Sequence, residues 1–219
     1  MKEEEILDKY GINLELFKKE QLKLAKNLDT KDIVDFYSAN NFCAVDSIIV
    51  KNQIISGAVI CDKDFNIVEE QYSLEKLNFP YVYGYRSFRE LSSMISAFNK
   101  LQERPDIVFV KGDGIAHPRL GLASHFSLVT GIPAVGVSEY LFDEDKIFGE
   151  DILRDEKKVG KVLISKTGSS PMYVSPGDKI SIASAFLLSK NLLNLPHKFP
   201  EPIHIAHKYV RAIKDELKI

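Results

Sequence analysis

Cysteine is scarce in this sequence, and long apolar runs are missing from it. The 219 residues include two cysteines, Cys43 and Cys61, and both lie in apolar runs, where a thiol usually packs as a small hydrophobic group. We therefore expect neither a disulfide framework nor a structural zinc cluster. No apolar segment approaches the roughly 18 to 20 residues that cross a bilayer, and residues 1–5 lack the cationic start and apolar stretch of a secretion signal. The sequence predicts a soluble, cytoplasmic protein that binds no membrane.

The sequence also lacks a large excess of charge of either sign. The 29 Lys and Arg residues nearly balance the 31 Asp and Glu residues, for a net charge of −2. A global cationic field that attracts nucleic acid is therefore not expected, and any phosphate-binding surface must be local. Basic residues gather late in the chain, at Lys190, Lys198, Lys208, Arg211 and Lys214. A solvated face explains most such clusters, so charge alone neither supports nor excludes a protein that binds nucleic acid.

Repeats and linkers are also absent from the sequence. It contains no internal repeat, low-complexity tract or Pro/Gly/Ser stretch that marks a domain boundary. With 45% hydrophobic and 27% charged residues, it has enough apolar material for one core. We expect a monomer with a single domain over residues 1–219, in which residues 1–40 form a helical segment packed on the rest.

The spacing of apolar residues predicts an α/β protein. Residues 14–28 have the spacing of an amphipathic helix, and residues 42–50, 53–61 and 65–74 read as three antiparallel strands joined by tight turns. Helices and strands then alternate. The helices are expected at residues 87–101, 120–130, 181–193 and 202–217, and the strands at 107–110, 134–137, 161–165 and 172–175. This order indicates a mixed sheet flanked by helices, and a ribonuclease H-like fold satisfies it, with the first strand central and strand 107–110 beside it.

A charged, glycine-hinged loop, residues 111–119 (KGDGIAHPR), follows the apolar strand 107–110. Gly112 and Gly114 let the backbone turn sharply beyond the carboxyl end of the strand, where ligands often bind in sheets of this kind. Acidic, imidazole and guanidinium groups converge in this loop. The alternative is an ordinary turn followed by a solvated segment.

The segment containing this loop resembles a known family. Residues 105–137 (PDIVFVKGDGIAHPRLGLASHFSLVTGIPAVGV) are similar to the signature block of the endonuclease V family. Residues 44–50 (AVDSIIV), 79–84 (FPYVYG) and 200–207 (PEPIHIAH) resemble further family segments, and the resemblance extends roughly over residues 42–214. It implies a Mg²⁺-dependent endonuclease, with Mn²⁺ as a substitute, that acts on DNA or RNA containing hypoxanthine. In the family, cleavage falls one nucleotide beyond the altered base and leaves 3′-hydroxyl and 5′-phosphate ends.

The resemblance assigns catalytic roles to several residues. Asp46 matches a metal ligand, although an acidic residue in such a strand otherwise faces solvent or pairs with a lysine. Glu90 matches the family's catalytic glutamate, while Ser87 and Glu90 also form a capping box in which Glu90 reaches back to the start of the helix. His207 matches a family histidine and is expected to contact the surroundings of the reacting phosphate.

Other matched residues are expected to bind nucleic acid. Tyr81 takes the place of the family's wedge tyrosine, and stacking of an aromatic ring on an exposed base contributes about 1–3 kcal/mol. Tyr83 stands where the family has a second proline, so the wedge is less rigid here. The alternative is that these tyrosines pack against the edge of the sheet. The remaining expected contacts to nucleic acid come from Lys111, from the backbone amides of Gly112 and Gly114, and from His117, Arg119 and His125.

Two positions depart from the family pattern. Lys111 stands where the family has an aspartate that binds the metal, and Glu139 stands where it has a lysine that holds the phosphate. This exchange of charge suggests that the two residues face each other across the sheet. In one interpretation Lys111 pairs with Asp46 and Glu139 and replaces the metal, which gives an inactive site. In the other, Asp113 and Glu139 join Asp46 as metal ligands, and Lys111 holds the phosphate.

Three functions follow from these alternatives. The first is a metal-dependent endonuclease in which Asp46, Glu90, Asp113 and His207 are catalytic, and Asp46, Asp113 and Glu139 bind the metal. The second is a relative that binds inosine-containing nucleic acid without cleaving it. The third is a structural or small-molecule-binding protein on the same fold.

Overall fold

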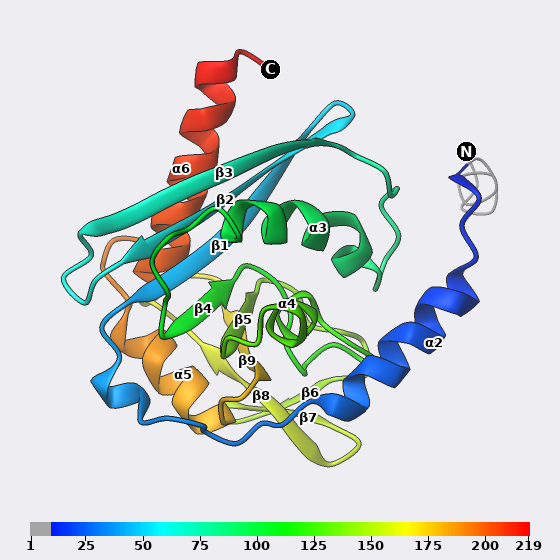
Figure 1. Cartoon of the computed structure of the whole chain (residues 1–219). Helices are drawn as coiled ribbons and strands as arrows, with labels where there is room; N and C mark the ends of the chain where they lie inside the picture. The colour runs from blue at the N-terminus through cyan, green and yellow to red at the C-terminus, as the bar shows by residue number, and fades with distance from the viewer. Residues whose placement is uncertain (1–9) are drawn as a thin grey trace.

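The structure is a computed structural model that describes residues 10–219, so the predicted helical segment 1–40 lies partly outside the described residues. Figure 1 shows a mixed β-sheet with helices on both of its faces. The sheet has nine strands in the order β3-β2-β1-β4-β5-β9-β8-β7-β6. The pairs β1–β4 and β4–β5 are parallel, and the other pairs are antiparallel. The predicted α/β fold, with β1 between β2 and β4, is confirmed.

The elements follow one another along the chain as the sequence predicted, with one addition. The strands are β1 (Phe42–Val50), β2 (Gln53–Cys61), β3 (Ile67–Lys76), β4 (Ile107–Val110), β5 (Ala134–Ser138), β6 (Lys146–Phe148), β7 (Asp151–Arg154), β8 (Lys157–Leu163) and β9 (Met172–Asp178). The α-helices are α2 (Leu14–Leu24), α3 (Arg86–Phe98), α4 (Leu122–Thr130), α5 (Ile182–Asn191) and α6 (Glu201–Leu217), and two 3₁₀ turns span Ala25–Asn27 and Phe36–Ser38. The hairpin β6–β7 was not predicted, because β6 is short and exposed along its whole length and has no buried face to create an alternating pattern.

Alternate side chains of the central strand β1 are buried on opposite faces of the sheet. Phe42 and Ala44 of β1 belong to the core under α5 and α6, whereas Cys43 and Val45 belong to the core under α3 and α4. Successive side chains of a strand point to opposite faces. The next residue, Asp46, is therefore directed toward α6. Both cysteines are buried and free, as expected.

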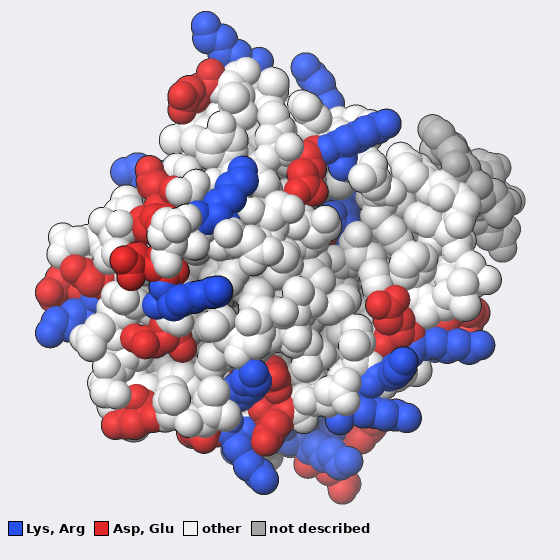
Figure 2. All heavy atoms as spheres, in the orientation of Figure 1, with Lys and Arg blue, Asp and Glu red and all other residues white. Residues whose placement is uncertain are grey.

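The surface agrees with the balanced charge of the sequence. Figure 2 shows one face of the molecule, on which Lys and Arg side chains are interspersed with Asp and Glu side chains. In the part of the chain that the structure describes, no helix combines the length and the apolar character needed to cross a membrane.

Candidate functional site

The parallel strands bring three sequence segments to one edge of the sheet. Val45 of β1 lies opposite Val110 of β4, and Val110 lies opposite Gly136 of β5. Asp46, the loop that starts at Lys111 and the end of β5 are therefore neighbours, because parallel strands end at the same side. Ligands of α/β proteins commonly bind at this edge.

Asp46 is buried and is held by a histidine of α6. Its side chain is 2% exposed, and His207 Nδ1 donates a hydrogen bond of 2.6 Å to Asp46 Oδ2. The other oxygen, Oδ1, accepts a hydrogen bond of 2.9 Å from the amide of Ser47. The alternative in which Asp46 faces solvent or pairs with a lysine does not hold. A buried carboxylate needs such partners, and the imidazole fixes its orientation.

Glu90 does not cap the helix. Helix α3 begins at Arg86 with Tyr85 as its N-cap, and no side chain caps it. Instead, Arg86 Nε and Nη2 donate to Glu90 Oε1 and Oε2 at 2.6 and 2.9 Å. The capping box, the alternative role of Glu90, is not formed, because α3 begins at Arg86 and Ser87 therefore lies inside the helix.

Arg86 is the residue that sequence reasoning missed. Burial alone would lower the pKa of its guanidinium, but Glu90, Asp46 and Asp113 together raise it. These three carboxylates come from α3, β1 and the loop after β4, and Glu90 is paired with Arg86 directly. The four-residue spacing between Arg86 and Glu90 was the available signal.

Asp113 is a partly buried carboxylate for which the effect of burial outweighs the positive charge around it. Burial raises its pKa, although a hydrogen bond with Ser138 and the charge of Arg86 act in the opposite direction. A carboxylate in this condition favours an additional cation or a proton. Asp113 is therefore the residue of the loop best suited to bind a positively charged group.

Lys111 and Glu139 do not form the ion pair predicted from the sequence. Lys111 Nζ lies 5.0 Å from the centre of the Phe199 ring, and within residues 10–219 it has no carboxylate oxygen within 4.0 Å. Glu139 Oε1 is paired instead with Lys198 Nζ at 2.6 Å. The expected pairing of Lys111 with Asp46 and Glu139 is wrong, because residues 198–199 from the segment before α6 lie at these positions.

Most of these groups line one cleft of about 430 Å³. It is lined by Tyr81, Val82, Tyr83, Gly84, Arg86, Glu90, Lys111, Asp113, His117, Ser138, Glu139, Tyr140, Leu141 and Phe142. Asp46 and His207 lie outside this lining. His207 borders a neighbouring hollow of about 350 Å³ together with Arg211. Arg86 lines the cleft, and the charge of Asp46 outside the lining also raises its pKa.

Two exposed tyrosines beside the cleft belong to a segment in which the neighbouring apolar side chains are buried. Tyr81 is 70% exposed and Tyr83 is 63% exposed, whereas Phe79, Val82 and Tyr85 between and around them are buried in a small apolar cluster. The alternative in which the tyrosines pack against the sheet edge therefore does not hold for Tyr81 and Tyr83. Their exposed rings are available to stack on a base.

His117 and Arg119 support this tyrosine segment. His117 Nε2 and Arg119 Nη2 both donate to the carbonyl oxygen of Gly84, at 3.1 and 2.9 Å, and Gln21 Nε2 donates to the same oxygen. Burial, followed by the charge of Arg119, lowers the pKa of His117 to about 3, so this imidazole is neutral. Both residues hold the segment in place, and their predicted contact with nucleic acid stays a prediction.

The glycine amides and His125 make internal contacts. The amides of Gly112 and Gly114 donate to Val137 O at 3.0 Å and to Ser175 Oγ at 2.9 Å, so neither N–H is free for a base. His125 is buried against Phe88 and lies outside the cleft lining. Burial lowers its pKa to about 4. These three residues therefore support the site through contacts inside the protein.

The mixed sheet and the carboxylates beyond its parallel strands define a ribonuclease H-like protein with a candidate nuclease site. The family model for Endonuclease V matches residues 22–208. Endonuclease V of Thermosipho melanesiensis is 33% identical over 204 residues, which are 90% of this chain and 89% of the relative. This chain belongs to the endonuclease V family.

Solved structures of similar proteins agree with this assignment. The catalytic domain of human Endonuclease V has a TM-score of 0.85 and 25% sequence identity, with 94% of this chain and 97% of that chain covered. Ciona intestinalis Endonuclease V, in complex with a 24mer DNA containing an inosine followed by a ribo-adenosine, has a TM-score of 0.85 at 22% identity, with 93% and 98% covered. These likenesses confirm the ribonuclease H-like fold.

Proposed function

We propose that this protein is a metal-dependent endonuclease that cleaves DNA or RNA strands near hypoxanthine. One observation carries the proposal: Glu90 and Asp113 line a cleft bordered by exposed tyrosines, and together with the buried Asp46 they act on the charge of Arg86 in the same lining. Family membership and the inosine-containing DNA bound by the Ciona relative support the choice of substrate.

The donors at the site fit Mg²⁺, with Mn²⁺ as a substitute. Magnesium prefers oxygen ligands and is usually bound by one or two carboxylates, water and substrate phosphate. Asp113 is partly buried and short of positive charge, and Asp46 is fixed by His207, so these two would hold the ion. Glu90 and Glu139 would join only when their ion pairs with Arg86 and Lys198 open. When bound, the ion would neutralise phosphate charge and lower the pKa of a bound water.

The side chains around the ion would position the strand. Lys111 and Arg86 line the cleft and can donate to phosphate oxygens, which favours charge that develops on the phosphate. His207 orients Asp46 and does not need to touch the strand to do so. Tyr81 would stack on the base beside the lesion and hold the strand open.

A second function, binding without cleavage, is favoured by the arrangement of the cations. The guanidinium of Arg86 already compensates Glu90 and competes with a metal for the other carboxylates. Within residues 10–219, no three acidic or histidine side chains of the cleft bring ligand atoms within 4.8 Å of one another. A site in this state can bind an inosine-containing strand and leave it intact.

Cleavage and binding must be measured on the same labelled strands. Inosine- and adenosine-containing DNA and RNA are incubated with wild type and Asp46→Asn, with Mg²⁺, with Mn²⁺ or with EDTA. We expect wild type to cut the inosine strand one nucleotide beyond the lesion, and Asp46→Asn to bind the same strand without cutting it. Inosine-selective binding without cleavage by wild type would establish the second function. Equal binding of inosine and adenosine strands would reject both.

A further inference from the structure

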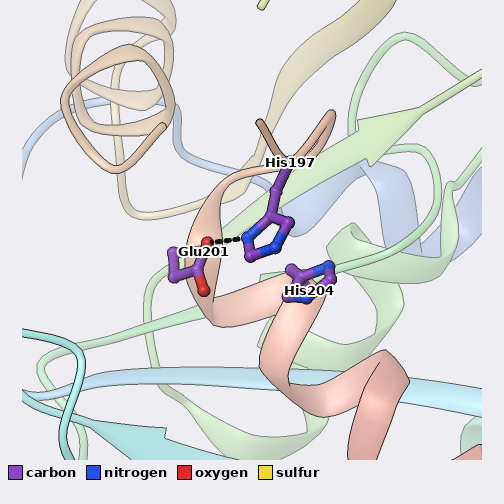
Figure 3. A group of neighbouring side chains, drawn as sticks. All are labelled: His197, Glu201 and His204. Atoms are coloured by element: carbon purple, nitrogen blue, oxygen red, sulfur yellow. Dashed lines mark hydrogen bonds and ion pairs between the residues drawn. The ribbon is translucent and has the colours of Figure 1, made fainter. Parts of the chain in front are cut away.

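A second group of metal-ligating side chains lies at the start of α6, outside the cleft lining. Figure 3 shows His197, Glu201 and His204, whose candidate ligand atoms all lie within 4.8 Å of one another. His197 Nδ1 donates to Glu201 Oε2 at 2.7 Å. The rings of His197 and His204 are stacked, with centres 3.5 Å apart and an angle of 13° between their planes. Glu201 is 6% exposed.

We propose that His197, Glu201 and His204 form a binding site for a divalent transition-metal ion of the Zn²⁺ class. Two imidazole nitrogens and one carboxylate oxygen suit Zn²⁺, Co²⁺ or Ni²⁺ and are a poor set for Mg²⁺, which prefers oxygen. Three protein ligands with a fourth position open to water is a common arrangement for zinc. The site is therefore chemically different from the carboxylates around Arg86.

The spacing of the ligand atoms is close to what such an ion requires. Ligands about 2.1 Å from a tetrahedral ion are about 3.4 Å from one another, which is inside the 4.8 Å spread of this group. An ion would replace the proton that now joins His197 to Glu201. Because nitrogen lone pairs lie in the ring planes, the two stacked rings must turn about their Cβ–Cγ bonds until those lone pairs converge.

The surroundings permit this rotation. His197, Glu201 and His204 border an open hollow of about 450 Å³ that Glu70 also lines, and the side chain of His197 is 32% exposed. Burial, followed by the charge of His197, lowers the pKa of His204. A neutral imidazole binds metal without first losing a proton. The buried carboxylate of Glu201 gains a full counter-charge when the ion binds.

Binding of an ion here would also stabilise contacts to two residues that line the cleft, Glu139 and Lys111. The two histidines flank a turn that carries Lys198 and Phe199. Lys198 is the ion-pair partner of Glu139, and Phe199 lies beneath the ammonium of Lys111. A metal that joins both ends of this turn reduces its freedom and keeps these contacts formed. The inference does not depend on whether the protein cleaves nucleic acid.

The test uses Co²⁺ and Zn²⁺ as probes of the full-length protein freed of metal. Co²⁺ bound by nitrogen in a four-coordinate site gives intense visible absorption, and Zn²⁺ abolishes that absorption when it replaces Co²⁺. We expect one Co²⁺ with this intense absorption per chain in wild type, an unchanged spectrum in Asp46→Asn, and at least a tenfold weaker affinity in both His204→Ala and His197→Asn. Circular dichroism checks that each variant is folded.

Hydrogen exchange gives a second readout of the same site. Zn²⁺ is expected to slow hydrogen exchange of the Lys198 and Phe199 amides in wild type. In His204→Ala, the exchange rates of these amides should be the same with and without Zn²⁺. The proposal would be overturned if wild type bound no Co²⁺, or if Asp46→Asn lost the absorption while His197→Asn and His204→Ala kept it. Equal affinities in wild type and both histidine variants would also overturn it.

Discussion

Gly57 of β2 lies directly beneath Val210 of α6, so closely that a Cβ atom on Gly57 would be 2.6 Å from Val210 Cγ1. Gly57 is also the cross-strand partner of Asp46 in β1. The missing side chain lets α6 approach the sheet at this point. His207, one turn earlier on the same helix, thereby comes within 2.6 Å of Asp46.

Gly57→Ala is therefore expected to push α6 away from the sheet and weaken the bond between His207 and Asp46. Overpacking of this kind costs about 1–3 kcal/mol of unfolding free energy, measured by urea denaturation, and cleavage should fall with it. The double variant Gly57→Ala/Val210→Ala restores the space and should recover much of both quantities. Full stability in the single variant would show that the close approach has no structural role.

Replacement of Arg86 by glutamine should strengthen Mg²⁺ binding. The guanidinium competes with a metal for Glu90, Asp46 and Asp113, so its removal should tighten binding several-fold in calorimetry. Arg89→Gln is the matched control, because Arg89 lies on the same helix and contacts the carbonyl oxygen of Phe79 instead. Equal or weaker Mg²⁺ affinity in Arg86→Gln would show that Arg86 does not occupy the place of the ion.

Lys111→Asp should increase cleavage at limiting Mg²⁺, because it places a carboxylate just beyond the strand that pairs with β1 and restores the family's residue there. The double exchange Lys111→Asp/Glu139→Lys should be less active than Lys111→Asp alone. Its second substitution removes the partner of Lys198 and puts two ammonium groups together. Initial rates over a range of Mg²⁺ concentrations distinguish the two variants, and a more active double exchange would contradict the geometry.

Two buried histidines should make the protein less stable in acid. Their pKa values, about 3 for His117 and about 4 for His125, lie below that of an unfolded histidine. The unfolded chain therefore binds more protons below about pH 6.5, and stability falls as the pH is lowered through this window toward the folded-state values. Each histidine should contribute a loss on the order of 2 kcal/mol at pH 5.

Urea denaturation of wild type and His125→Leu at pH 7 and pH 5 isolates one of these contributions. The variant should lose less stability than wild type between the two pH values. The comparison between proteins matters, because the raised pKa of Asp113 changes stability in the opposite direction. Identical losses in both proteins would show that His125 is not held neutral in the folded state.

The sequence predicted those parts of the site that depend on local pattern. The apolar run around Asp46 and the run before Lys111 identified β1 and β4, and their parallel pairing follows from the chain order. The family resemblance added Glu90 and the exposed tyrosine at residue 81. The alternation of side chains along β1 would also have predicted that Asp46 points to the face of the sheet that α6 covers.

Other contacts could not be predicted, because they depend on packing between distant segments or on a choice between two local patterns. Glu90 fits both a capping box and a pair with the arginine four residues earlier, and only the start of α3 decides between them. Lys198 and Phe199 contact the cleft residues Glu139 and Lys111 from a segment about sixty residues after Glu139. No pattern in the sequence connects those positions.

Cleavage of an inosine-containing strand by Asp113→Asn tests the central claim most directly, since Asp113 is proposed to replace the metal ligand lost at Lys111. The variant removes a partly buried carboxylate with a raised pKa, so its fold should be retained and its binding of the strand preserved. The predicted result is at least a hundredfold slower cleavage in Mg²⁺ with unchanged affinity for the strand. Cleavage as fast as that of wild type would contradict the claim.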